Sequence, residues 1–186
     1  MIKKYNIIYA DPPWSYNRKI GRGIAETQYQ TMSIEEIGSI PVNKITADDA
    51  MLFLWVTFPQ LKEGLSVIES RVFKYKTCAF NWIKQNLKSD TFFVGFGFWT
   101  RSCLEICLLA TKGHPRRVST NVRQLCIAHR MQHSKKPDEI RDRIVELCGD
   151  LPRIELFARE TSEGWDCLGN EIDGRDIRDA IEELLR

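Results

Sequence analysis

The chain has 186 residues, 43% of them hydrophobic and 28% charged, and its 27 basic and 25 acidic residues leave a net charge of +2. These values are typical of a soluble globular protein of ordinary size, so we expect a single domain over residues 1–186. No apolar run approaches the roughly 20 residues of a transmembrane helix, so no membrane span is expected.

Six cysteines are scattered along the chain without a C-x-x-C pair, and the three histidines show no zinc-ligand spacing with them. This usage favours buried free thiols in a reducing compartment over disulfides or metal ligands. We therefore expect a cytoplasmic protein without a metal site.

The first element in the chain is an apolar run over residues 5–10, which predicts a buried strand because the prolines of Asp11-Pro12-Pro13-Trp14 end it. In open α/β sheets, ligands bind at the carboxyl ends of strands. Pro12 and Pro13 have a fixed φ and no backbone donor, so we expect a stiff turn whose carbonyls are free to accept hydrogen bonds.

The chemistry of this stretch suits methyl transfer to the exocyclic amine of a base. Such an amine is a poor nucleophile, and acceptors on its hydrogens, here the Asp11 carboxylate and the Pro12 carbonyl, would stabilise the positive charge that develops on nitrogen. Trp14 offers a face on which the base stacks. The alternative is a plain Asp-Pro turn with Trp14 in the core; four residues in this order after an apolar strand favour the functional interpretation.

Residues 15–32 follow as a loop rich in glycine and charge, which we expect to cover the site. Tyr16 and Tyr29 within it are candidates for stacking on a base. Ser33 then predicts a helix N-cap, with Glu36 as its capping-box partner.

The middle of the chain predicts two strands and a helix. The continuous apolar run over residues 51–56 is typical of a central strand. A helix is expected after Thr57, with Pro59 near its start and apolar residues on one face. Another strand is expected over residues 73–84.

Residues 85–99 are expected to form a loop that ends in aromatic residues interleaved with glycine. We expect most of these aromatics to cap the core, and Trp99 to line a pocket for an unstacked base. Glu105 follows inside an apolar run, where a carboxylate needs a partner. It is either a structural hydrogen-bonding group or an acid near the substrate, and the residues alone do not decide between the two.

Residues 112–136 carry seven Lys or Arg and no Asp or Glu, which favours contact with nucleic-acid phosphates over a merely solvated loop. Pro137 predicts the first turn of a helix that Gly149 ends. Lys136 therefore stands at the entrance of this helix, as a surface lysine or as a contact to cofactor or substrate.

The last part of the chain predicts a strand over residues 153–158, followed by Arg159 at a position that suits cofactor binding. A final amphipathic helix is expected to begin at a cap formed by Asp173 or Asp176.

The stretch Tyr9-Ala10-Asp11-Pro12-Pro13-Trp14-Ser15-Tyr16 resembles the signature of the DPPW adenine-N6 methyltransferases. That family includes the catalytic subunit of the messenger-RNA adenosine methyltransferase and small bacterial and phage DNA enzymes. Further stretches resemble the family in its order: residues 95–101 with Glu105, residues 111–113, residues 133–139, and residues 154–159 with 164–166 and 169–171.

The resemblance implies an α/β fold: the Rossmann-like S-adenosylmethionine-dependent methyltransferase fold in permuted order, with a mainly parallel sheet and helices on both faces. It implies that Asp11, Pro12, Pro13 and Trp14 form the catalytic motif, and that Tyr29, Glu105 and Lys136 lie near the substrate base. It further implies S-adenosylmethionine contacts from Asp11, Lys136, Arg159, Asn170 and Glu171.

The expected function is methyl transfer from S-adenosylmethionine to the N6 amine of adenine in DNA. DNA is favoured because the chain is compact and carries no appended RNA-binding module. Adenosine-N6 methylation of RNA, a catalytically silent nucleic-acid-binding subunit of a heteromeric methyltransferase, and methylation of another planar amide or amine remain alternatives. We expect a monomer or homodimer, with a partner subunit as a further option.

Overall fold

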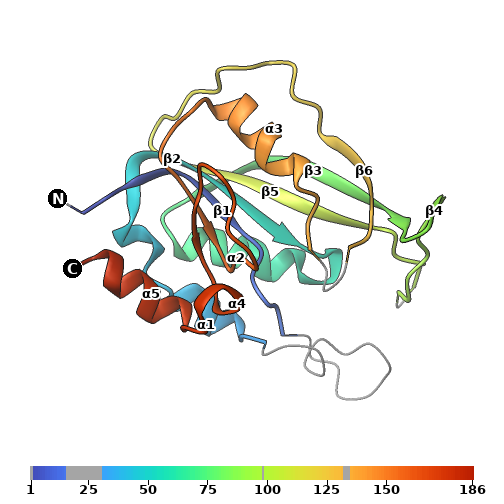
Figure 1. Ribbon diagram of the computed structural model, residues 1–186, viewed down its shortest axis with the longest axis horizontal. Coiled ribbons are helices and arrows are strands. Elements are labelled where there is room, and N and C mark those ends of the chain that lie inside the picture. The colour runs from blue at the N-terminus through green and yellow to red at the C-terminus, as the bar shows by residue number, and fades with distance from the viewer. Residues whose placement is uncertain (1, 16–30, 98, 132–134) are drawn as a thin grey trace.

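The computed structural model describes residues 2–15, 31–97, 99–131 and 135–186 (Figure 1). Its centre is a sheet of eight strands in the order β4-β3-β5-β2-β1-β7-β8, with β6 paired to β3. The strands are β1 (Tyr5–Ala10), β2 (Thr46–Val56), β3 (Lys74–Asn86), β4 (Ser89–Phe92), β5 (Leu104–Lys112), β6 (Leu125–His129), β7 (Arg153–Leu156) and β8 (Asp166–Leu168). The helices are α1 (Ile34–Ser39), α2 (Leu61–Ser70), α3 (Glu139–Cys148), α4 (Asn170–Asp173) and α5 (Ile177–Leu184), with short 3-10 turns at Val42–Lys44 and Phe58–Gln60.

The directions of the strands bring several chain segments to one edge of the sheet. β1 runs parallel to β2 and β7, and β5 runs antiparallel to β2. The carboxyl ends of β1, β2 and β7 therefore lie at the same edge as the start of β5. Four of the seven strand pairings are parallel, which together with the helices confirms the predicted α/β class.

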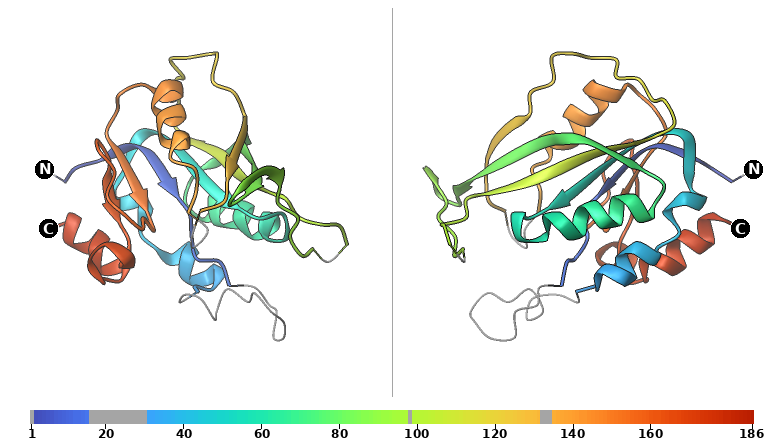
Figure 2. Two further views of the ribbon diagram at one scale, coloured as in Figure 1. Left: turned by 45° about the vertical axis from the view of Figure 1, so that its right-hand side comes forward. Right: turned by 180° about the vertical axis from the view of Figure 1, so that it is seen from behind.

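Helices cover both faces of the sheet, as Figures 1 and 2 show. On one face, α1, α2 and α5 pack on apolar strand residues such as Ile8 and Leu52. On the other face, α3 packs on residues such as Ile7 and Phe53. Neighbouring residues of β1 thus serve opposite cores, which explains why that strand is apolar throughout. None of the described helices is long and apolar enough to cross a membrane.

Most of the predicted elements form, but two segments in which no strand was expected each contain one. Ser33 and Glu36 make the predicted capping box at the start of α1. β4 lies within residues 85–99, and β6 lies within the basic segment 112–136. Both strands are short. β6 pairs in parallel with β3, some 40 residues earlier in the chain, so the local sequence pattern alone does not predict this strand. At the end of the chain, Asp176 caps α5, whereas Asp173 belongs to α4.

Gly149 ends α3 in a backbone conformation that only glycine adopts readily, with φ 87° and ψ 174°. We expect Gly149→Ala to lower the free energy of unfolding by about 1–3 kcal/mol, measured by urea denaturation. Gly174→Ala is the matched control, because Gly174 lies in the ordinary left-handed region with φ 76° and ψ 0° and open space around it. Equal losses in the two variants would contradict this reasoning.

Candidate active site

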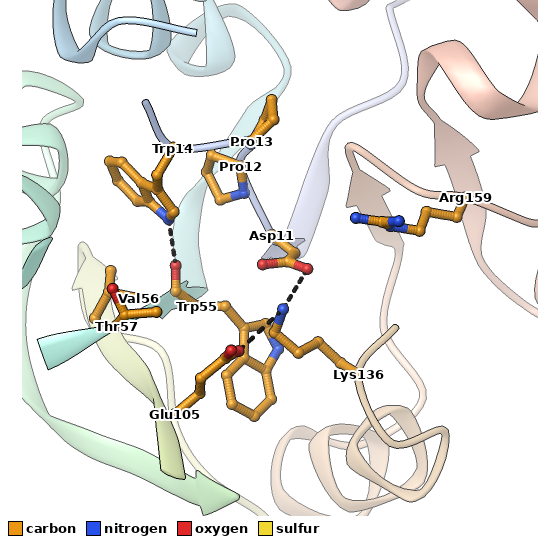
Figure 3. Close-up of a pocket in the computed structure, with 10 residues that line it drawn as sticks. All are labelled: Asp11, Pro12, Pro13, Trp14, Trp55, Val56, Thr57, Glu105, Lys136 and Arg159. Atoms are coloured by element: carbon orange, nitrogen blue, oxygen red, sulfur yellow. Dashed lines mark hydrogen bonds and ion pairs between the residues drawn. The ribbon is translucent and has the colours of Figure 1, made fainter. Parts of the chain in front are cut away.

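A cleft opens at the edge of the sheet where β1 and β2 end and β5 begins (Figure 3). It encloses about 440 Å³, part of it open to solvent. Its lining consists of Asp11, Pro12, Pro13, Trp14, Trp55, Val56, Thr57, Glu105, Lys136 and Arg159. The structure thus brings the whole predicted motif together with three residues predicted from distant parts of the chain.

Asp11 follows β1 directly, and its carboxylate lies inside the cleft. The Lys136 ammonium donates a hydrogen bond of 2.5 Å to Asp11 Oδ2. Burial raises the pKa of Asp11, and the Lys136 charge offsets part of this effect. The Lys136 ammonium, at this distance, favours the ionised form of Asp11.

Glu105 has the partners that its apolar surroundings require. Lys136 Nζ lies 3.2 Å from Glu105 Oε2, and Lys84 Nζ lies 2.5 Å from Glu105 Oε1. Burial acts to raise the pKa of Glu105, but the two lysines outweigh it and hold that pKa below its usual value. Burial acts to lower the pKa of Lys136, and the two carboxylates outweigh it, so that pKa is raised. Lys136 is therefore an ammonium shared between two carboxylates, as Figure 3 shows.

Trp14 lines the cleft and is also part of the core. Its side chain is buried, and its indole N–H donates a hydrogen bond of 3.0 Å to the Trp55 carbonyl. The Trp55 indole in turn donates to the Tyr9 hydroxyl, at 2.7 Å. This chain of contacts fixes the orientation of Trp14. The residue is thus buried in the core, as one interpretation of the sequence had it, and it also forms part of the cleft wall, as the other required.

The prediction that the proline carbonyls are unengaged is wrong. The Pro12 carbonyl accepts a hydrogen bond of 2.9 Å from the Trp14 backbone N–H, and the Pro13 carbonyl accepts one of 2.8 Å from Met32. The missing N–H groups of the prolines do not prevent neighbouring residues from donating to their oxygens. A carbonyl oxygen has two lone pairs, so Pro12 retains the capacity to accept a second hydrogen bond.

A second cleft of about 340 Å³ adjoins the first and shares Asp11, Lys136 and Arg159 with it. The other lining residues are Tyr9, Lys135, Arg141, Glu155, Phe157 and Glu160. Arg159 also pairs with Glu171 at the start of α4, 3.4 Å away, and Asn170 precedes Glu171 in that helix. Three of the predicted cofactor residues, Arg159, Asn170 and Glu171, therefore gather at the end of β7 and the start of α4. The other two, Asp11 and Lys136, line both clefts.

The sequence analysis missed several residues of the second cleft. Glu155 is buried in β7 and accepts two hydrogen bonds from Arg141, of 2.7 and 3.0 Å. A carboxylate within an apolar strand was the available signal, as it was for Glu105. Phe157 has a φ of 62°, which is costly for a bulky residue, and such strain often accompanies ligand sites.

One predicted substrate residue does not line the clefts, and two others cannot be placed. Tyr16 and Tyr29 lie outside the described residues. Trp99 is not part of the lining of either cleft, and its side chain is 99% exposed. It follows β4, an edge strand four positions from β1 in the sheet order, so the structure does not bring it to Asp11. This corrects the expected position of Trp99.

An Asp-Pro-Pro-Trp turn at the carboxyl end of a central strand, beside a charged cleft in an α/β sheet, is the arrangement that the resemblance to adenine-N6 methyltransferases implies. The MT-A70 family model matches residues 5–171, and the chain belongs to that family. The predicted resemblance and the predicted enzyme class are thereby confirmed.

Individual relatives differ in how much of their length the chain covers. The chain is 39% identical over 190 residues to the type II methyltransferase M.MunI from a Mycoplasma species. This alignment covers 91% of this chain and 78% of M.MunI. It is 28% identical to the human N(6)-adenosine-methyltransferase catalytic subunit METTL3, over 96% of this chain but 30% of METTL3. It is 30% identical to the Drosophila melanogaster N(6)-adenosine-methyltransferase MT-A70-like protein, over the whole chain but 29% of that protein.

Proposed function

We propose that the protein transfers a methyl group from S-adenosylmethionine to the N6 amine of adenine in DNA. The observation that carries the proposal is the Asp11 carboxylate, held by Lys136 in a cleft at the end of β1. DNA is favoured over RNA because the match spans most of M.MunI but less than a third of the N(6)-adenosine-methyltransferase relatives.

The residues of the second cleft fit S-adenosylmethionine chemically. Lys136 and Arg159 are cations suited to its carboxylate, and Asp11 is suited to its positively charged groups. Asn170 and Glu171 offer an amide and a carboxylate for the ribose hydroxyls. When bound, this cofactor would supply an activated methyl group, and the protein would supply position and electrostatics.

We assign the protein's own part of the chemistry to the motif. Because Lys136 already donates to Asp11 Oδ2, we propose that the adenine amine donates one hydrogen bond to Asp11 Oδ1. Its second hydrogen is donated to the Pro12 carbonyl. Both acceptors stabilise the positive charge that develops on N6. Trp14 forms a rigid wall that orients the base, and Tyr16 and Tyr29 are the proposed stacking partners. A target base in duplex DNA must first leave the helix.

The basic segment is proposed to bind phosphates. It leaves β5 at Lys112, which pairs with Ala50 toward the end of β2 opposite the cleft, and it runs back toward the cleft through β6. Arg116, Arg117 and Arg123 are exposed, and no acidic residue lies between Lys112 and Lys136. Phosphate contacts of this kind provide affinity without sequence preference. The recognition of a particular sequence therefore falls to other parts of the protein, to a second copy or to a partner subunit.

RNA is the second candidate substrate, supported by the identity of 28–30% to relatives named as N(6)-adenosine-methyltransferases. A silent subunit is disfavoured because Asp11 and Trp14 are both intact and both line the cleft.

The test is transfer of labelled methyl from S-adenosylmethionine to matched duplex DNA, single-stranded DNA and RNA, with the product identified by mass spectrometry. We expect N6-methyladenine in DNA. Strong methylation of RNA without methylation of DNA would show that RNA, and not DNA, is the substrate. Cofactor binding without transfer to any of the three polymers would overturn the proposed acceptor.

A further inference from the structure

Four charged side chains of alternating sign form one chain of contacts through the site: Lys84, Glu105, Lys136 and Asp11. The three nitrogen–oxygen distances are 2.5, 3.2 and 2.5 Å in that order. The side chains are at most 22% exposed. Lys84 is the outer member; unlike the other three, it is not part of the lining of the cleft.

The strand pairing explains how Lys84 reaches Glu105. β3 pairs with β5 so that Trp82 faces Glu105 across the two strands. Lys84 lies two residues beyond Trp82 and therefore on the same face of the sheet. Its ammonium lies 5.0 Å from the centre of the Trp82 ring, which holds its position near Glu105.

The balance of charge gives Lys84 a role. Asp11 and Glu105 bring two negative charges into a partly buried site, and Lys136 contacts both of them. Arg159 adds a positive charge on the Asp11 side. Without a second cation at Glu105, the two carboxylates would compete for Lys136, and the like charges would favour protonation of one of them. Lys84 provides this second cation at Glu105 Oε1, on the side away from Lys136.

We propose that Lys84 is a positioning residue for methyl transfer: it holds Glu105 ionised and in place, so that Lys136 remains directed at Asp11 and Asp11 keeps its charge for the adenine amine. The proposal rests on the proposed function of this site. Lys84 acts through Glu105 and Lys136 and does not touch the reacting atoms.

Other ionisable groups surround Asp11 and stay unchanged when Lys84 is altered. They come from three parts of the sheet: Tyr9 on β1, Cys107 on β5, Glu155 on β7, and Arg159 after β7. A shift in the titration of Asp11 upon substitution of Lys84 is therefore attributable to the chain of contacts through Glu105.

The experiment compares Lys84→Met with Lys84→Arg and with the surface control Lys74→Met, since Lys74 is an exposed lysine on the same strand. In Lys84→Met we expect the acid limb of kcat against pH to move up by about one unit, so that turnover on that limb falls about tenfold. The loss should shrink as the pH is raised. Lys84→Arg should restore the wild-type profile, and Lys74→Met should leave it unchanged.

Two further measurements separate this role from a structural one. Carbon-13 NMR of the Asp11 carboxylate should show a higher pKa in Lys84→Met than in the wild type, whether or not the protein methylates DNA. In a double-mutant cycle, Lys84→Met should cause no further shift once Glu105→Gln has removed the acid. If Lys84→Met does not fold, Lys84→Gln replaces it in the same comparison, since it also removes the charge at Glu105 Oε1.

An unmoved acid limb and an unmoved Asp11 titration in Lys84→Met would overturn the proposal. A loss of activity that is equal at all pH values and is not restored by arginine would also overturn it, because it would indicate a packing role. Absence of methyl transfer by the wild type, with the Asp11 shift observed, would overturn the proposed function and leave the electrostatic role of Lys84 supported.

Discussion

Asp11→Ala is expected to lower kcat for methyl transfer by about 10³-fold, the scale of loss when a preorganised electrostatic contact to the transition state is removed. The carboxylate lies in the cleft, and the alanine methyl group cannot accept a hydrogen bond from the adenine amine. We expect S-adenosylmethionine binding by calorimetry to survive in large part, because Lys136, Arg159, Asn170 and Glu171 remain. Asp90→Ala is the matched control, since Asp90 is 92% exposed in its side chain.

The pH profile of the same reaction tests the charge of Asp11. Burial raises the pKa of Asp11 more than Lys136 lowers it. Activity that needs the carboxylate is therefore full above this raised pKa and is lost as the pH falls through it. The acid limb should lie at a higher pH than an ordinary aspartate would give.

Asp11→Asn separates the charge from the hydrogen bond. The amide oxygen still accepts a hydrogen from the amine, so we expect more residual activity than in Asp11→Ala but no acid limb. Wild-type turnover in Asp11→Ala would refute the mechanism. An unchanged acid limb in Asp11→Asn would assign that limb to another group.

The elements of the fold that the sequence predicted correctly are those with local signals. β1 and its motif follow one another within ten residues, and the capping box of α1 spans four. In such stretches, periodicity, proline and capping chemistry are sufficient to identify the element.

The parts that the sequence did not reveal depend on pairing between distant segments. Nothing in the sequence distinguishes Lys84 from the lysines near it. The register of β3 and β5 pairs Trp82 with Glu105 and so brings Lys84, two residues further on the same face, to the Glu105 carboxylate. Trp99 was expected at the base pocket because aromatic residues and glycines surround it in the sequence. It follows β4, however, which lies at the edge of the sheet far from β1. The engagement of the Pro12 carbonyl likewise follows from the path of the turn and not from its residue types.

Lys136→Met is expected to cause the largest loss of stability among these variants, about 3–5 kcal/mol in the free energy of unfolding at neutral pH. Its side chain is 9% exposed and its ammonium contacts both Asp11 and Glu105. Removing the ammonium leaves two partly buried carboxylates without their shared cation. Lys135→Met is the matched control, because the neighbouring Lys135 pairs with the exposed Asp138 and Glu160, and such surface pairs contribute little.

The pH dependence of this loss distinguishes charge from packing. In the wild type the pKa of Glu105 is lowered, so its contribution to stability is complete above the pKa of the unfolded chain and is lost as the pH falls through the folded pKa. In Lys136→Met the carboxylates take up protons more readily, which relieves the uncompensated charge. The difference between wild type and variant should therefore shrink between about pH 7 and about pH 4.5 in urea denaturation. A difference that stayed constant over this range would mean that the aliphatic part of Lys136, and not its charge, stabilises the site.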